Sequence, residues 1–338
     1  MKALIATIFI CAGIPAFSQE PDSSAYYFSK AMEEKEAGRY LVASSLFEKA
    51  LFHDPANKTA YLQNGYTYLQ MKMTDKAKTS FTRLLEMDPQ NQDAIRQLTQ
   101  LYFNYHQYEL AIDMAGKCRD YAETDRILGM SYYKTEDYPM AEKHLAAALQ
   151  KNPADAEVAY TMGRNYLDME AYTKAVPFYD KAVQLDDTRN VWMYELGLLY
   201  YNLNNFKSAM AAFKMAAEKG YVQSNDFKEN LGYASLYSGE YESGESLLLA
   251  VWQRKPGSKD ILRDMAEIFY QQKQYDKSLS YCQKLMELDL KDGKALYQAG
   301  LCFQKKGQKD RGQQMCDKAI EMDPSLASLR RKKEMPGM

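Results

Sequence analysis

The side chains that most often do chemistry are scattered along this 338-residue chain. The three histidines, His53, His106 and His144, are far apart, and no serine or cysteine stands near them in a recognisable nucleophile motif. Neighbouring carboxylates such as Asp186 and Asp187 diverge on a helix or in a loop, so we interpret them as solvated surface. The sequence contains no glycine-rich phosphate loop. We therefore predict that the chain is not an enzyme and needs no cofactor.

Cysteine spacing gives no metal motif either. Beyond Cys11, the cysteines are Cys118, Cys282, Cys302 and Cys316, with no Cys-x-x-Cys pair and no nearby histidine. Cys118, Cys282 and Cys316 fall where the helical pattern places apolar side chains, which favours buried small hydrophobes. A Cys282–Cys302 or Cys302–Cys316 disulfide is the alternative, because an exported chain meets an oxidising compartment.

The elements that carry these residues follow a repeat. Gly129, Gly163 and Gly197 are spaced 34 residues apart, and Gly232 follows after 35. Small residues, aromatic residues and prolines recur with the same period. The pattern reads Asn64-Gly65, Tyr68, Ala77, Phe81, Leu84 and Pro89 in one copy, and Leu128-Gly129, Tyr132, Ala141, Leu145, Ala148 and Pro153 in another. Glycine and alanine belong where two helices cross closely, rings fill the wider gaps, and proline separates the copies.

This pattern resembles the tetratricopeptide repeat (TPR), a 34-residue helix–turn–helix. The resemblance implies an all-α fold, a right-handed α-solenoid of tandem helical hairpins in which each repeat packs on its neighbours. It predicts nine TPR repeats over 24–326, namely 24–57, 58–91, 92–121, 122–155, 156–189, 190–224, 225–258, 259–292 and 293–326. The third repeat is short, and its second helix is expected to end near Ala115 and Gly116.

The two termini differ from the repeats. The N-terminus predicts a signal peptide over 1–18, because it has a basic residue, Lys2, an apolar run over 3–17 and the small–x–small site Ala16-Phe17-Ser18. Cleavage is expected near Ser18-Gln19, and residues 19–23 form a short lead before the repeats. The run is too short and too interrupted to favour a membrane span. We expect an exported protein, periplasmic or extracellular. Residues 327–338, with four basic residues at 330–333, are expected to form a basic cap and a frayed tail.

Composition narrows the class of partner. The formal net charge of −2 provides no basic footprint for nucleic acid. The 28 tyrosines exceed what the structural positions of the repeat account for. Chaperone-binding members of the family hold a C-terminal carboxylate with lysine and asparagine at positions 5 and 9 of a repeat, where this chain has, for example, Leu62 and Tyr66. That carboxylate clamp is absent.

The resemblance implies that positions 2, 5, 9, 12 and 13 of each repeat line a concave groove. Tyrosine and arginine, the residue types enriched at binding hot spots, recur at those positions. The predicted ligand-binding residues are Arg96, Phe103, Arg126, Tyr133, Tyr160, Arg164, Tyr194, Tyr201, Tyr233, Arg263 and Tyr270. The alternative is that many of these rings pack on the neighbouring repeat. The hypothesis places an extended peptide or a partner helix over repeats three to six.

We therefore predict a non-catalytic protein–protein interaction scaffold or adaptor of the bacterial cell envelope. Two alternatives stay open at this point. Aromatic grooves also suit sugars, which would make the chain a glycan-binding protein. The chain could instead be a fixed structural subunit of a secretion or outer-membrane assembly complex. The repeat does not identify the partner.

Overall fold

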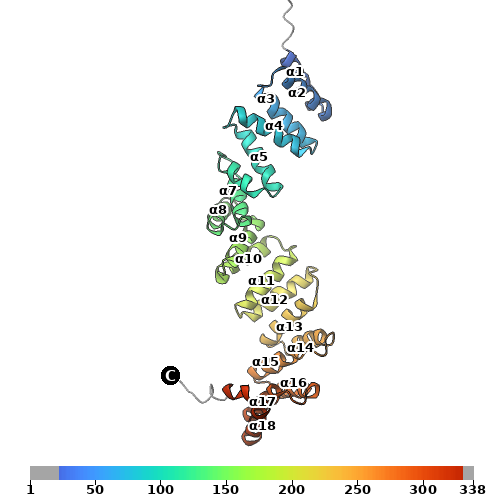
Figure 1. The fold of residues 1–338 in the computed structure, drawn as a ribbon, viewed down its shortest axis with the longest axis vertical. Coiled ribbons are helices and arrows are strands. Elements are labelled where there is room, and N and C mark those ends of the chain that lie inside the picture. The colour runs from blue at the N-terminus through green and yellow to red at the C-terminus, as the bar shows by residue number, and fades with distance from the viewer. Residues whose placement is uncertain (1–22, 330–338) are drawn as a thin grey trace, which may run out of the picture. The chain divides into compact units, whose positions relative to one another are not determined.

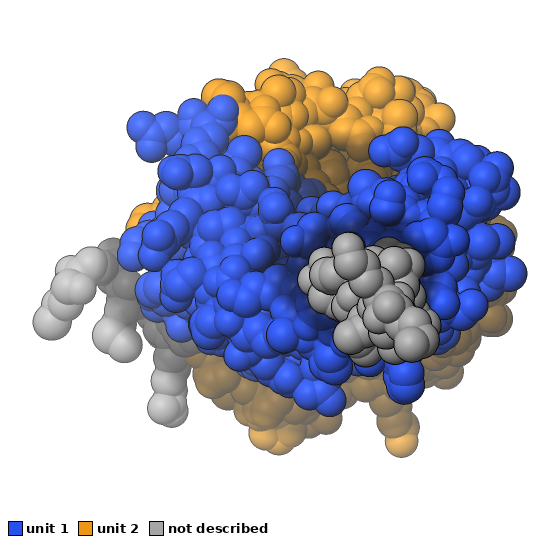
Figure 2. Space-filling view, turned by 90° about the horizontal axis from the view of Figure 1, so that it is seen from above, with its two compact units in different colours: residues 1–151 blue, residues 152–338 orange. Residues whose placement is uncertain are grey.

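The structure, a computed structural model, describes residues 23–329. The predicted signal peptide and the basic residues 330–333 lie outside the described residues. Over 23–329 the only regular elements are helices, eighteen α-helices and one 3₁₀ helix, and this confirms the predicted all-α fold. Figure 1 shows them coloured from blue near the N-terminus to red near the C-terminus and labels most of the α-helices. The chain divides into two compact units, residues 1–151 and 152–338 (Figure 2).

Each unit consists of helical hairpins. Unit 1 contains α1 (Ser23–Glu36), α2 (Tyr40–His53), α3 (Lys58–Gln70), α4 (Thr74–Met87), α5 (Gln92–Asn104), α6 (Tyr108–Ala115), α7 (Thr124–Lys134) and α8 (Tyr138–Lys151). Unit 2 contains α9 (Ala156–Asp168), α10 (Tyr172–Leu185), α11 (Asn190–Asn202), α12 (Phe206–Glu218), α13 (Asn225–Tyr237), α14 (Tyr241–Trp252), α15 (Asp260–Gln271), α16 (Tyr275–Leu288), α17 (Gly293–Lys305), α18 (Lys309–Met322) and η1 (Pro324–Leu326).

Within each unit, every odd-numbered helix pairs with the helix that follows it, and each hairpin packs against the next. This succession of neighbour-on-neighbour contacts is the arrangement of an α-solenoid. The boundaries of the nine predicted repeats stay a sequence prediction. The expectation for the third repeat is confirmed, because α6 has only eight residues and ends at Ala115.

The recurring glycines lie where the helices of a hairpin cross. A Cβ atom at Gly65 would lie 2.5 Å from the ring of Phe81. A Cβ atom at Gly129 would lie 2.8 Å from the backbone nitrogen of Leu145. No real Cβ makes such contacts, so these positions require glycine for close approach. The predicted packing role of the periodic glycines is confirmed.

The described cysteines form no disulfide. Cys282, Cys302 and Cys316 are buried, whereas Cys118 is half-buried. The Cys302 thiol donates a hydrogen bond to Ser278 Oγ at 3.2 Å. Burial raises the pKa of the Cys282 thiol to about 12. The prediction of buried small hydrophobes is confirmed for Cys282 and Cys316. It is wrong for Cys118, because α6 ends at Ala115 and leaves Cys118 half-buried after the helix.

Candidate functional site

The first helix of each hairpin carries the residues that the sequence places on the inner face. All eleven predicted ligand-binding residues are half-buried, neither in the core nor fully exposed. Arg96, Phe103, Arg126 and Tyr133 belong to unit 1, and the other seven belong to unit 2. Because each unit is described by itself, the site is built below from residues of one unit only. The predicted groove over repeats three to six stays a prediction.

In unit 1, the predicted residues contact their own repeat and its neighbours. Arg96 Nη2 donates to the backbone oxygen of Arg119 at 3.3 Å. The ring of Phe103 meets Tyr108 edge to face, with 6.3 Å between centroids. Tyr133 lies 6.4 Å from the ring of Tyr138. These contacts hold the three side chains in place.

At the start of unit 2, Tyr160 and Arg164 belong to a closely packed cluster of aromatic side chains around Glu195. Tyr160 stacks on Trp192 with 4.5 Å between ring centroids. The hydroxyls of Tyr160 and Tyr179 both donate to Glu195 Oε2, at 2.9 and 3.0 Å. Arg164 adds an ion pair to the same carboxylate at 3.3 Å. Burial, followed by the charge of Glu195, raises the pKa of Tyr160 to about 12. These rings pack between adjacent repeats, as in the alternative that the sequence left open for the inner-face tyrosines.

The Tyr194 side chain of α11 also packs against several neighbouring residues. It stacks on Tyr221 with 4.5 Å between centroids, and Phe213 and Phe227 lie within 5.7 Å of it. Its hydroxyl accepts a hydrogen bond from Asn230 Nδ2 at 2.9 Å. The side chain is a packing element between two hairpins. Its replacement would therefore disturb the solenoid as well as any ligand.

Further along unit 2, three tyrosines surround an open hollow instead. Tyr201 of α11 and Tyr233 and Tyr237 of α13 line a hollow of about 260 Å³, together with Asp264, Glu267 and Ile268 of α15. We call these six residues the tyrosine–carboxylate hollow. The Tyr233 hydroxyl donates to Asp264 Oδ2 at 2.8 Å. Phenols and carboxylates of three successive hairpins thus converge on one open space.

Phe206 packs against two of the three rings that line this hollow. Tyr237 stacks on Phe206 at 4.3 Å between centroids, and Tyr201 meets the same ring edge to face at 5.3 Å. Burial raises the pKa of Tyr201 to about 12, with added contributions from Tyr237, Asp264 and Glu229. Burial and the carboxylates of Asp226 and Asp264 also raise the pKa of Glu229. The hollow is therefore rigid and electrostatically negative.

A second hollow, of about 440 Å³, follows on the other side of α15. Its lining residues are Arg263, Asp264, Ala266, Glu267, Cys282, Leu285, Lys294, Ala295, Tyr297, Gln298, Leu326 and Leu329. Asp264 and Glu267 line both hollows. Arg263 Nε and Gln298 Nε2 are buried donors without a hydrogen-bond partner among the described residues. We call this space the second hollow.

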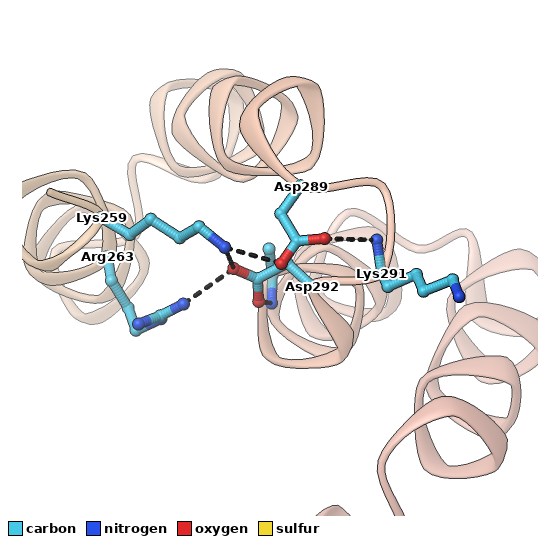
Figure 3. A network of polar contacts seen from close by, with 6 residues as sticks. Lys259, Arg263, Asp289, Lys291 and Asp292 are labelled. Carbon is cyan, nitrogen blue, oxygen red and sulfur yellow. Dashed lines mark hydrogen bonds and ion pairs between the residues drawn. The ribbon is translucent and has the colours of Figure 1, made fainter. Parts of the chain in front are cut away.

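Arg263 itself is anchored to the next repeat. Its Nη2 lies 2.8 Å from Asp292 Oδ2 (Figure 3). Lys259 lies between Asp289 and Asp292, at 2.7 and 3.8 Å from their carboxylates. Asp292 also caps α17, because its Oδ1 accepts from the backbone N–H of Ala295 at 3.0 Å. The predicted arginine thus connects two hairpins, and its side chain also lines the second hollow.

The sequence missed the most informative carboxylate of the site. Asp264 occupies position 6 of the predicted eighth repeat, which is outside the inward-facing positions. Tyr270, which was predicted, meets the ring of Tyr275 at 5.7 Å and lines neither hollow. Only the contact from Tyr233, 31 residues earlier, reveals that Asp264 faces inward.

Two other kinds of site find no support in the part of the chain that the structure describes. Over 23–329, no group of three or more His, Cys, Asp or Glu side chains could hold a metal ion. In the same range, no helix combines the length and the apolar character that crossing a bilayer requires. What the described chemistry offers is an open aromatic and acidic surface.

Comparison with known families agrees with the hairpin architecture. Sequence models described as "Tetratricopeptide repeat" match residues 59–91, 128–190, 160–224 and 293–326. The chain contains tetratricopeptide repeats. The matched ranges include the TPR hairpins of α9 to α12 and of α17 and α18, which lie in unit 2.

The TPR chain is also similar to longer and shorter known proteins. It is 25% identical over 218 residues to the peroxisomal targeting signal receptor of Kluyveromyces lactis. The aligned region covers 62% of this chain and 38% of the receptor. It is 24% identical over 216 residues to the type IV pilus assembly protein PilF of Pseudomonas aeruginosa, covering 62% of this chain and 85% of PilF. The solved pilF structure superimposes with a TM-score of 0.44, at 24% identity, and covers 63% of this chain and 98% of that structure.

TPR repeats are generally non-catalytic scaffolds, but some relatives are transferases. The human protein O-mannosyl-transferase TMTC1 is 26% identical over 162 residues, which are 47% of this chain and 18% of TMTC1. The chain thus spans well under half the length of both this transferase and the peroxisomal receptor. The absence of catalytic activity stays a prediction.

Proposed function

We propose that this TPR chain is a non-catalytic protein-binding scaffold or adaptor, and that the inner face of unit 2 binds an extended peptide segment of its partner. The observation that carries the proposal is the tyrosine–carboxylate hollow. Tyr160 and Tyr194 are used in contacts between repeats, whereas Tyr201, Tyr233 and Tyr237 line an open space. Rigid aromatic walls of this kind provide contact area at low entropic cost.

The size and the continuity of the two hollows favour a peptide over a compact ligand. Each hollow is of the size that accepts one or a few side chains, and both share Asp264 and Glu267 along α15. An extended chain places successive side chains in successive hollows, and its backbone oxygens can satisfy donors along the way. The relatives support a binding role, since one is named as a receptor for a targeting signal and another as a pilus assembly protein.

Site-specific photo-crosslinking tests the proposal. A photo-reactive benzoylphenylalanine at Gln271, an exposed position beside the hollow whose side chain contacts Glu267, is expected to form an adduct of one defined mass in the producing cells. The same residue at Lys214, an exposed position on the second helix of its hairpin, is the matched control and is expected to form none. Equal adducts at both positions, or none at Gln271, would contradict the proposal. Binding to a glycan array without a protein adduct would favour the glycan alternative.

We also propose that the chain works in the cell envelope after export. The support is the basic start, the apolar run over 3–17 and the small–x–small site before Gln19. N-terminal sequencing of the protein from a periplasmic or medium fraction is expected to begin at or near Gln19. Recovery of an uncleaved chain in the cytoplasmic fraction would contradict export without affecting the binding proposal.

A further inference from the structure

The tyrosine–carboxylate hollow contains negative charge that no cation of the described chain neutralises. Asp264 accepts the hydroxyl of Tyr233, and Glu267 Oε1 accepts from Gln271 Nε2 at 3.0 Å. Over residues 23–329, neither carboxylate forms an ion pair, and neither does Glu229 nearby. A ligand that enters the hollow therefore meets two carboxylates whose hydrogen-bond partners within residues 23–329 are the neutral side chains of Tyr233 and Gln271.

The cations closest in sequence are committed elsewhere. Lys259 directly precedes α15, and Arg263 lies in its first turn. Lys259 pairs with Asp289, and Arg263 pairs with Asp292 (Figure 3). These ion pairs connect the start of α15 to the segment between α16 and α17. The charge of the hollow is thus left for a partner to neutralise.

The walls of the hollow suit a cation in a second way. An aromatic ring attracts a cation over its face, and several rings around one space form a cage for ammonium groups. Tyr201 and Tyr237 are held in place by Phe206, so the cage exists before any ligand binds. Preorganisation of this kind reduces the entropic cost of binding. Burial and neighbouring carboxylates raise the pKa of Tyr201 to about 12 and also raise that of Tyr237, so both phenols stay neutral.

We propose that the tyrosine–carboxylate hollow binds a lysine or arginine side chain of an extended partner segment. The inference rests on the proposed function and specifies its ligand. The ammonium or guanidinium group lies among the rings of Tyr201, Tyr233 and Tyr237 and pairs with Asp264 and Glu267. A positively charged side chain is the complement of two carboxylates and three ring faces.

The second hollow explains why the cation belongs to a peptide. It continues from Asp264 and Glu267 into apolar walls that include Leu285 and Tyr297. Arg263 and Gln298 also line this hollow, so it combines apolar walls with side chains that can donate hydrogen bonds to a peptide backbone. A basic residue in the first hollow therefore places the adjoining part of the segment over the second.

A direct binding measurement on the purified full chain tests this inference. The probes are the octapeptides acetyl-(Gly-Lys)₄-amide and acetyl-(Gly-Arg)₄-amide, with acetyl-(Gly-Gln)₄-amide as the neutral comparison and spermidine as the free-amine comparison. At least one basic peptide is expected to bind at least about tenfold more tightly than the neutral peptide at low salt. The difference is expected to shrink as salt screens the charges.

Substitutions place the binding in the hollow. Glu267→Lys is expected to weaken binding of the basic peptide by about tenfold or more. Glu287→Lys is the matched control, because Glu287 also accepts from a glutamine four residues away, Gln283, but lies on α16 outside both hollows. Tyr201→Leu is expected to weaken binding by about two- to fivefold, whereas Tyr201→Phe keeps the ring and is expected to keep the affinity.

The outcomes separate this inference from the proposed function. Equal weakening by Glu267→Lys and Glu287→Lys, or equal binding of basic and neutral peptides, overturns the cationic ligand. Spermidine that binds as tightly as the basic peptides overturns the peptide segment. A crosslink from Gln271 to a protein partner would survive either result. Conversely, tight and hollow-dependent peptide binding stands even if no partner is crosslinked. Circular dichroism melting of each variant verifies that it is folded.

Discussion

At the scale of single residues, the inner face divides into side chains that join repeats and side chains that stay available. Asp292 belongs to the first kind. Its side chain is 4% exposed, and it binds Arg263 and Lys259 while it caps α17. A buried carboxylate is tolerated only when such partners compensate its lost hydration.

Replacement of Asp292 is expected to weaken unit 2 substantially. Asp292→Ala removes a helix cap and leaves Arg263 without its ion-pair partner, so we expect a loss of about 2–4 kcal/mol in the free energy of unfolding. Urea unfolding followed by circular dichroism measures it. Asp289→Ala is the control, because Asp289 is more exposed and is expected to cost clearly less. Equal losses for the two variants would contradict the structural role of Asp292.

Two carboxyl groups are expected to make stability fall in acid. Burial alone would raise the pKa of Asp125, but hydrogen bonds from Lys151 and His144 outweigh it and hold that pKa below its ordinary value. The pKa of Glu245 is lowered in the same way by Lys277 and Tyr281. A carboxyl with a lowered folded-state pKa adds stability above its unfolded-state pKa, and this stability is lost as pH falls through the folded value.

The melting temperature of the chain is therefore expected to decline as pH falls below about 4, where unfolded-state carboxyl groups begin to bind protons. The double variant Asp125→Asn, Glu245→Gln is expected to melt lower at pH 7 and to show a shallower decline. Circular dichroism melts at pH 7, 5, 4 and 3 provide the comparison. Parallel declines in the two proteins would show that other groups govern the acid response.

At the scale of elements, the hairpin depends on the close crossing of its two helices. In the last hairpin, a Cβ at Gly300 would lie 2.6 Å from Cys316 Sγ and 2.7 Å from the backbone oxygen of Gly312. The backbone oxygen cannot move aside without separating α17 from α18. The crossing thus has no room for a methyl group.

Gly300→Ala is accordingly expected to destabilise the chain by about 1–3 kcal/mol, the usual cost of overpacking a filled site. Gly257 offers a matched control, because a Cβ there would meet no atom within 4 Å. Gly257→Ala is expected to be neutral or to stabilise the chain by up to about 1 kcal/mol. Urea unfolding of both variants tests the pair. A Gly300→Ala protein as stable as the parent would contradict the crossing argument.

The helical hairpins and the early end of α6 were predictable because their signals are local. The glycine, alanine and ring positions lie within one 34-residue period, and the early end of α6 follows from Ala115-Gly116 in the sequence itself. The partner of each inner-face ring was not predictable in this way. Tyr160 with Glu195 and Tyr233 with Asp264 are contacts between repeats, 35 and 31 residues apart. Which residue each ring contacts depends on how one hairpin packs on the next.

At the scale of the whole molecule, both hollows belong to unit 2. Every residue that lines them lies between 201 and 329, within the range of that unit. A solenoid is stabilised by contacts between sequence neighbours, so a run of complete hairpins carries most of its own stabilising contacts. Unit 2 contains five such hairpins, α9 to α18.

A fragment of residues 152–338 is therefore expected to fold and to bind acetyl-(Gly-Lys)₄-amide with the affinity of the full chain, within about threefold. Circular dichroism tests for helix and cooperative melting, and peptide titration tests for the hollow. The same fragment with Glu267→Lys is the control and is expected to lose binding. A folded fragment that binds at least tenfold more weakly than the full chain would show that unit 1 contributes to the site.

The sequence by itself determined the helical hairpin, its period and the close crossings, because glycine, alanine, aromatic rings and proline act within one repeat. It also predicted which tyrosines and arginines stand near the inner face. Only the tertiary structure decided which of them are used between repeats, as Tyr160 and Arg263 are, and which leave an open hollow, as Tyr201 and Tyr237 do. The reason is that a ring at a given helical position is filled or left open by the side chains of the next hairpin, and periodicity alone does not specify that packing.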